Sequence, residues 1–177
     1  KQQGKKIEVD GDRLPSRAMA IHEHIRQEGE KEMERDAMAL LWSAIAAGLS
    51  MGASLLAKGI FHVQLDGVPG GFLLENLGYT FGFIIVIMAR QQLFTENTVT
   101  AVLPVMQKPT LGNVGLLMRL WGVVLLGNII GTGIAAWAFE YMPIFDEPTR
   151  DAFTKIGMDV MKNTPTEMFR SEEHTSE

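Results

Sequence analysis

Two long stretches without a charged residue constrain this chain most strongly. Twenty-one uncharged residues lie between Asp36 and Lys58, and twenty more lie between Arg119 and Glu140. An apolar stretch of about 20 residues matches the hydrocarbon core of a bilayer, so each stretch predicts a membrane-spanning helix. The mean hydropathy of +0.08 hides this pattern, because seventeen of the thirty-seven charged residues fall within residues 1–36. The sequence therefore predicts an all-α membrane protein with polar ends.

The composition excludes several other classes of protein. Without cysteine, the chain has no disulfide scaffold, thiolate metal site or cysteine nucleophile. The sequence has no basic stripe with interleaved aromatic residues, the pattern that would indicate a nucleic-acid partner. The sequence contains no paired carboxylates, no metal-ligand spacing and no nucleophile–base set of the kind that would indicate an enzyme. We therefore expect no catalytic residue, no metal site and no cofactor.

The first predicted span follows a polar N-terminal segment. Residues 1–36 carry both charge signs, and a surface helix is expected over 18–36, where apolar positions are sparse. The span itself is expected over about 37–58, ending where Lys58 can extend its ammonium group to the interface. Residues 59–71 are rich in glycine and contain a proline, which predicts a loop.

A third span is expected over about 116–140, with Trp121, Trp137 and Tyr141 toward its two ends, where aromatic belts form. Residues 142–169 follow it. Lys and Arg number eight in residues 1–36 and none in 59–71, and an excess of these residues marks cytoplasmic flanks. The N-terminus is therefore expected in the cytoplasm, and three crossings place residues 142–169 on the outer side.

Small residues recur at four-residue spacing within the spans, a pattern that lets helix backbones approach closely in lipid. An asparagine inside a span either links helices by hydrogen bonding or contacts a substrate. The candidate packing residues are Gly48, Gly52, Gly82, Gly127, Asn128 and Gly131.

The second span is interrupted by charged residues. Fourteen uncharged residues from Asn76 to Ala89 are too few to cross a bilayer alone, and a second uncharged stretch begins at Asn97. A charge at mid-bilayer costs at least about 2.5–3.5 kcal/mol on insertion scales, so it is tolerated where it faces protein or water. A crossing over about 72–107, broken at 90–97, predicts a discontinuous helix, which transporters use to place backbone groups near the midplane.

The two ends of the chain predict a fragment. The sequence begins at Lys1 rather than at Met, and its last eight residues, 170–177, read RSEEHTSE. This octapeptide resembles the in-frame translation of a common sequencing adapter. We interpret residues 170–177 as an artefact tail beyond which the natural protein continues. A chance acidic tail is the alternative.

Two motifs resemble those of the formate/nitrite transporter family. LFTEN, at Leu93–Asn97 after a glycine-containing apolar half-helix, resembles the LFTxN signature of the loop that interrupts the second span of the family. WGVVLLGNIIG, at Trp121–Gly131, is similar to the third-span pattern of the family. The resemblance covers roughly residues 37–141.

This resemblance implies six spans built as two inverted repeats of three, so the chain would be the first half of a six-span inverted-repeat channel fold. Members are pentamers in the bacterial inner membrane, and each protomer has a pore for small monovalent anions such as formate or nitrite. The implied partners are therefore a small anion, the lipid bilayer and copies of the chain. The residues assigned to the pore or substrate pathway are Leu93, Phe94, Thr95, Tyr79, Phe83, Arg90, Glu96 and Asn97.

The chain departs from the family pattern on both sides of LFT. Arg90, Gln91 and Gln92 stand where the family usually has Gly-Ala-Glu/Asp, and Glu96 replaces a small residue. Arg90 either concentrates anions in a narrow cleft of low dielectric or forms a structural pair with Glu96. The alternative to a small-anion channel is a non-transporting three-helix membrane anchor or assembly subunit whose break is only a packing kink.

Overall fold

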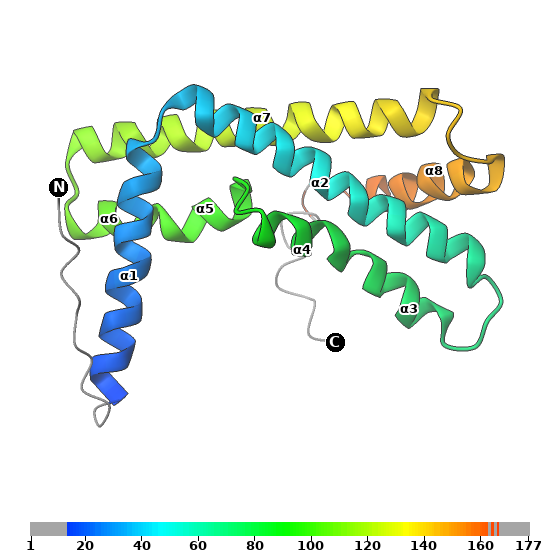
Figure 1. Ribbon diagram of the computed structural model, residues 1–177, viewed down its shortest axis with the longest axis horizontal. Coiled ribbons are helices and arrows are strands. Elements are labelled where there is room, and N and C mark those ends of the chain that lie inside the picture. Colours follow the sequence, from blue (N-terminus) through cyan, green and yellow to red (C-terminus); the bar gives the residue numbers. More distant parts are fainter. Residues whose placement is uncertain (1–13, 163, 165, 167–177) are drawn as a thin grey trace. The chain divides into compact units, whose positions relative to one another are not determined.

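The computed structural model describes residues 14–162, 164 and 166. Within these residues the chain forms eight α-helices and no strand, which confirms the all-α prediction (Figure 1). The helices divide into two units. The first unit combines the residues up to Ala44 with Gln92–Gly127, and the second combines Ile45–Gln91 with the residues from Asn128 onward.

Three helical segments are long and apolar enough to cross a bilayer, as the sequence predicts. They are α2 (Ala37–Gln64), the stretch Gly71–Met88, and α7 (Leu111–Tyr141). The second of them consists of α3 (Gly71–Gly78) and α4 (Thr80–Met88), which meet at Tyr79.

The second candidate span corrects one expectation from the sequence. Counting uncharged residues starts this segment at Asn76 and finds it too short to cross alone, whereas the helical stretch has 18 residues. At about 1.5 Å per residue that is about 27 Å, close to the hydrocarbon thickness of about 30 Å. The difference comes from Glu75, which ends the uncharged run but is tolerated within α3, where its Oε2 atom lies 3.1 Å from Nδ1 of His62.

Other helix ends also differ from the expected ranges. Helix α2 continues to Gln64 instead of ending near Lys58, because the apolar pattern extends through Ile60, Phe61 and Val63. Helix α8 (Glu147–Met161) lies in the stretch expected only as a segment after the third span. The tail at residues 170–177 lies outside the described residues.

The first unit contains α1 (Leu14–Glu34), α5 (Phe94–Thr100), α6 (Val102–Gln107) and the N-terminal parts of α2 and α7. Helix α1 packs on α5 and α6, where Gly29 lies against the backbone of Thr100. The core of this unit consists of Met33, Leu40, Ala44, Ala101, Leu117, Leu120 and Val124.

The junction of α1 and α2 is fixed by side chains at both helix ends. Asp36 Oδ1 accepts the N–H groups of Met38 and Ala39 at 2.9 and 3.2 Å, which satisfies free donors at the start of α2. Arg119 Nη2 donates to the carbonyl oxygens of Met33 and Arg35 at 2.8 and 2.9 Å. A cation suits this position because the end of a helix carries partial negative charge.

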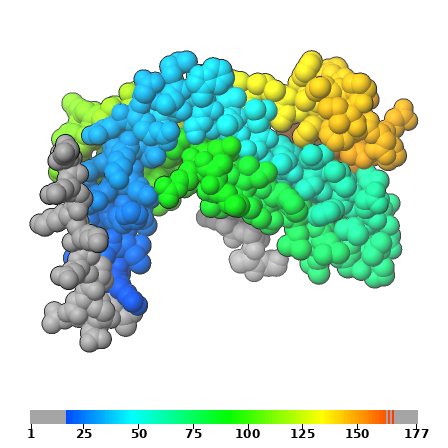
Figure 2. Space-filling view, in the orientation of Figure 1, coloured from blue at the N-terminus to red at the C-terminus, as the bar shows by residue number. Residues whose placement is uncertain are grey.

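The second unit contains α3, α4, α8 and the C-terminal parts of α2 and α7. Its aromatic cluster joins Phe139 of α7 to Phe145 and to Phe153 of α8, with ring centroids 5.1–5.6 Å apart. Large apolar side chains remain exposed along α3 and α4, on the surface coloured teal to green in Figure 2. Exposure of this kind suits helices that face lipid. The most exposed are Phe72, Leu73, Ile87 and Met88.

Candidate functional site

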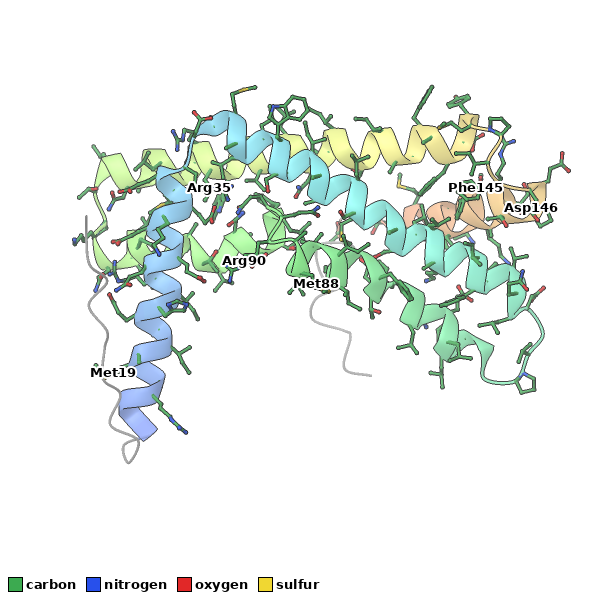
Figure 3. The ribbon with its side chains drawn as sticks, in the orientation of Figure 1. Met19, Arg35, Met88, Arg90, Phe145 and Asp146 are labelled. Atoms are coloured by element: carbon green, nitrogen blue, oxygen red, sulfur yellow. The ribbon has the colours of Figure 1, made fainter. Side chains whose placement is uncertain are left out.

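Helix α4 ends in a left-handed turn at Arg90. The N–H of Arg90 donates to the carbonyl of Ile87 at 3.2 Å, and the N–H of Gln91 donates to that of Val86 at 3.0 Å. This pair of bonds is a Schellman motif, in which the residue after the helix cap has positive φ. Arg90 has φ 49, and Figure 3 shows it just beyond Met88. The turn stops the helix while satisfying two of its last carbonyl groups.

The chain then resumes as a new helix within the LFTEN motif. Leu93 is extended, with φ −101 and ψ 131, and α5 begins at Phe94. Four of the five residues of LFTEN, which the family resemblance places in a loop, are therefore helical. The break itself occupies residues 89–93 instead of 90–97. No side chain caps α5.

A buried polar network holds this segment in the first unit. Gln92 and Asn97 are 7% and 4% exposed, and Asn97 Nδ2 donates to Gln92 Oε1 at 2.8 Å. Gln92 Nε2 donates to Glu32 Oε2 of α1 at 2.9 Å, and the Gln92 N–H donates to Ser43 Oγ of α2 at 3.2 Å. Gln92 thus attaches the start of the motif to α1 and α2, and Asn97 is bonded to Gln92.

Phe94 packs into the core of the first unit. Its ring meets that of Trp121 edge-on, with centroids 6.2 Å apart, and Trp121 Nε1 donates to the carbonyl of Asn97 at 3.1 Å. Trp121 thus lies well inside α7 and binds LFTEN, a contact that its expected place near the end of the span does not predict. Leu93 is half-buried, whereas Thr95 and Glu96 are exposed.

Tyr79 and Phe83 lie one turn apart in the second unit. Their ring centroids are 5.4 Å apart, Tyr79 is exposed and Phe83 is half-buried. The α3–α4 junction beside them is bound to α2 by Ser54, whose hydroxyl donates to the carbonyl of Tyr79 and accepts the N–H of Gly82. Ser54 therefore fixes the backbone beside these two residues of the predicted pathway.

Glycines bring α2 and α7 into close approach within the second unit. A Cβ added at Gly48 would lie 2.5 Å from the carbonyl oxygen of Asn128, and one at Gly52 would lie 2.7 Å from Ala135 Cβ. Gly131 faces the backbone of Ile45 at a similar closeness. Of the remaining predicted packing residues, Gly82 lies against Ser54, and Gly127 and Asn128 are buried.

Arg90 and Glu96 belong to different units. Both side chains are exposed. Their pairing, and the assignment of all eight pathway residues to a pore, stay predictions.

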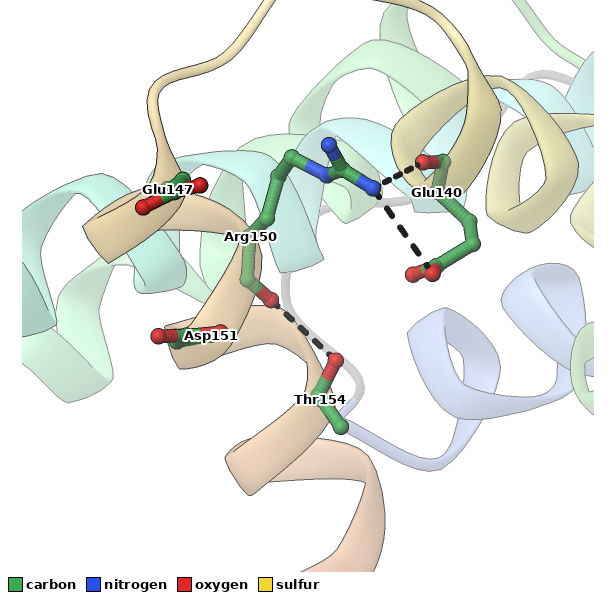
Figure 4. A pocket seen from close by; sticks show the side chains of 5 residues that line it. All are labelled: Glu140, Glu147, Arg150, Asp151 and Thr154. Carbon is green, nitrogen blue, oxygen red and sulfur yellow. Dashed lines mark hydrogen bonds and ion pairs between the residues drawn. The ribbon is translucent and has the colours of Figure 1, made fainter.

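A polar cavity of about 380 Å³ lies elsewhere in the second unit, lined by Glu140, Glu147, Arg150, Asp151 and Thr154 (Figure 4). Arg150 Nη2 donates to the carbonyl of Glu140 at 2.7 Å and lies 3.8 Å from its Oε1. Arg150 thereby satisfies a carbonyl at the end of α7 and attaches α8 to it. Within the described residues, no group of three or more His, Asp or Glu side chains has the arrangement of a metal site.

Sequence reasoning missed Glu32, Ser43 and Ser54, which bind the break and its flanks. Each is a small or polar residue on a neighbouring helix, without a motif of its own. The sequence could have drawn attention to Gln92, because a polar residue just before LFT needs a hydrogen-bond partner if it is buried. Its partner Glu32 is 60 residues away in sequence, a separation at which residue spacing predicts no contact.

Comparison with known proteins identifies the class of protein. The sequence profile of the formate/nitrite transporter family matches residues 19–171, so the chain belongs to the formate/nitrite transporter family. This confirms the resemblance seen in LFTEN and in the third-span motif.

One curated relative is much more similar than family membership alone requires. Inner membrane protein YfdC of Escherichia coli (strain K12) is 89% identical over 169 residues, which cover 96% of this chain and 54% of that protein. The chain thus spans about half the length of the curated relative it matches. The name of that relative agrees with the three apolar helices found here.

Proposed function

We propose that the intact protein is a channel or transporter for small monovalent anions such as formate or nitrite, and that this chain supplies its first three-span repeat. Family membership supports the anion class. The coverage of about half of a closely similar inner membrane protein supports a second repeat of similar length.

The observation that carries the proposal is the interrupted helix. Helix α4 stops at a left-handed residue, Leu93 is extended, and α5 starts without a side-chain cap. Irregular backbone at membrane depth is tolerated only where it is buried in protein or lines a water-filled cavity. A break followed directly by the exposed Thr95 and Glu96 of α5 therefore suits the wall of a pathway better than a lipid-facing kink.

We also propose the finer features that the family implies. The protein would be a pentamer in a bacterial inner membrane, with its N-terminus in the cytoplasm and one pore in each protomer. The pathway would be lined by Leu93 and Thr95 on one side of the break and narrowed by Tyr79 and Phe83.

Flux measurement on the full-length protein tests this function. Purified protein in liposomes should release internal formate or nitrite faster than empty liposomes do. Thr95→Trp should reduce the flux because it places a large ring on the exposed side of the LFTEN segment. Met106→Trp, at a 73% exposed position on α6, is the control and should leave the flux unchanged. Folded full-length protein without flux of any small monovalent anion would contradict the proposal.

A further inference from the structure

Gln92 is the point at which the LFTEN segment joins two other helices of the first unit. Its backbone N–H bonds to Ser43 of α2 and its side-chain nitrogen bonds to Glu32 of α1. Its side-chain oxygen accepts the Asn97 amide from within the motif. With 7% of the residue exposed, water does not replace these bonds readily.

The orientation of the Gln92 amide is set by Glu32. A carboxylate only accepts hydrogen bonds, so the NH₂ group of Gln92 must face Glu32 and its oxygen must face Asn97. Glu32 is itself oriented by Arg35, whose Nη1 donates to the same Oε2 atom at 2.9 Å. The direction of donation therefore runs from Arg35 and Gln92 to Glu32, and from Asn97 to Gln92.

The two buried amides bracket the part of the motif that is open. Asn97 is held a second time, through its carbonyl, by Trp121. Thr95 and Glu96, between the two held residues, are exposed. The exposed residues thus have no freedom to move away from the core without breaking bonds at Gln92 or Asn97.

We propose that Gln92 is a positioning residue: its amide, oriented by Glu32, sets the position of Leu93–Glu96. The importance of that position for anion passage rests on the function proposed above. The coupling between Glu32 and Gln92 does not, because it concerns the local structure of the first unit alone.

Amide hydrogen exchange of the full chain in lipid nanodiscs tests the proposal. The readout is the protection factor of the amides from Asn97 to Ala101. Gln92→Leu removes the side-chain bonds and should speed their exchange about tenfold, which corresponds to about 1.4 kcal/mol of local opening free energy. Gln107→Leu, at an exposed glutamine of α6, is the matched control and should exchange like wild type. Amides from Leu117 to Val124 report whether the core of the unit is intact.

Gln92→Glu tests the role of Glu32 separately from packing. At neutral pH it places two carboxylates at hydrogen-bond distance, so protection should fall. A proton shared between the two carboxyl groups at low pH restores the hydrogen bond, so protection should recover on acidification.

The double variant Glu32→Gln/Gln92→Glu exchanges the donor and the acceptor. The new amide on α1 can donate to the new carboxylate, which also accepts from Asn97, so protection at neutral pH should return to near the wild-type value. Double-variant protection no higher than that of Gln92→Glu, or wild-type protection in Gln92→Leu, would overturn the proposal. If Gln92→Leu does not fold, the proposal is decided by whether the protection of Gln92→Glu recovers on acidification.

These outcomes are separable from those of the flux experiment. Loss of the exchange pattern with normal anion flux would overturn the role of Gln92 and leave the proposed function standing. The expected exchange pattern in a protein without anion flux would overturn the proposed function and leave the role of Gln92 standing.

Discussion

The hydroxyl of Ser54 donates a 2.6 Å hydrogen bond to the carbonyl oxygen of Tyr79 and accepts the N–H of Gly82 at 2.9 Å. One side chain of α2 thus satisfies an acceptor at the α3–α4 junction and a donor in the first turn of α4. Ser54 is 1% exposed, so bulk solvent does not reach its side chain. The backbone beside Tyr79 and Phe83 is held by this residue.

Replacing Ser54 by alanine should destabilise the protein. Both backbone groups lose a buried partner, and a buried unsatisfied group costs about 1–3 kcal/mol. The free energy of unfolding, measured in detergent, should fall by about that amount. Ser50→Ala, one turn earlier on α2 and half-buried, is the control with a smaller expected effect. Equal stabilities of the two variants would show that the Ser54 bridge does not hold the junction.

Because α2 and α7 approach closely, the effect of replacing a glycine by alanine on stability should depend strongly on its position. Gly48→Ala places a methyl group 2.5 Å from a backbone oxygen, so the helices must separate, at a cost of about 1–3 kcal/mol. Gly133→Ala, also in a helix, meets nothing within 4 Å and should be neutral or slightly stabilising. Thermal unfolding of both variants compares them directly. A Gly48→Ala protein as stable as Gly133→Ala would mean that the two helices are not in backbone contact.

The left-handed turn predicts a stabilising substitution at the break. A non-glycine residue in this conformation costs about 1–2 kcal/mol, and glycine does not. Arg90→Gly should therefore raise the local stability of the α4 end, by less than the full amount because glycine also loses more entropy on folding. The comparison is Gln91→Gly, which gains nothing from its backbone and should destabilise. Hydrogen exchange of the Arg90 and Gln91 amides measures the effect.

Sequence patterns predict only part of this architecture. The uncharged runs predict the spans, and LFTEN predicts the family, because both are local signals. The charged residues predict a break at 90–97, but the left-handed turn at Arg90 is hidden, since arginine rarely adopts positive φ. The bond between Glu32 and Gln92 is hidden for another reason: two polar residues far apart in sequence meet only when α1 packs on α5 and α6.

The polar surface of α1 predicts a weak dependence on pH. Hydrogen bonds from Arg26 lower the pKa of the Glu23 carboxyl from 4.5 to about 2. A lowered pKa in the folded state gives a stabilisation that is present above pH 4.5 and is lost as pH falls toward 2. Wild type should therefore be more helical than Glu23→Gln at neutral pH and equal to it at pH 2. Because the half-buried pair lies at the surface of α1, salt should reduce the difference. A constant difference across this pH range would rule out the ion pair as its cause.

Charge exchange at the break separates the two roles open to Arg90. If Arg90 pairs with Glu96, Arg90→Glu leaves two like charges and should lower the yield of folded full-length protein. Arg90→Glu/Glu96→Arg restores opposite charges and should recover most of that yield. If Arg90 instead concentrates anions, Arg90→Ala should fold normally and lose flux, most clearly at low ionic strength, where the field of the cation is least screened. Yield measured by size-exclusion chromatography and flux measured in liposomes give independent readouts, and a double variant that folds no better than Arg90→Glu would exclude the pair.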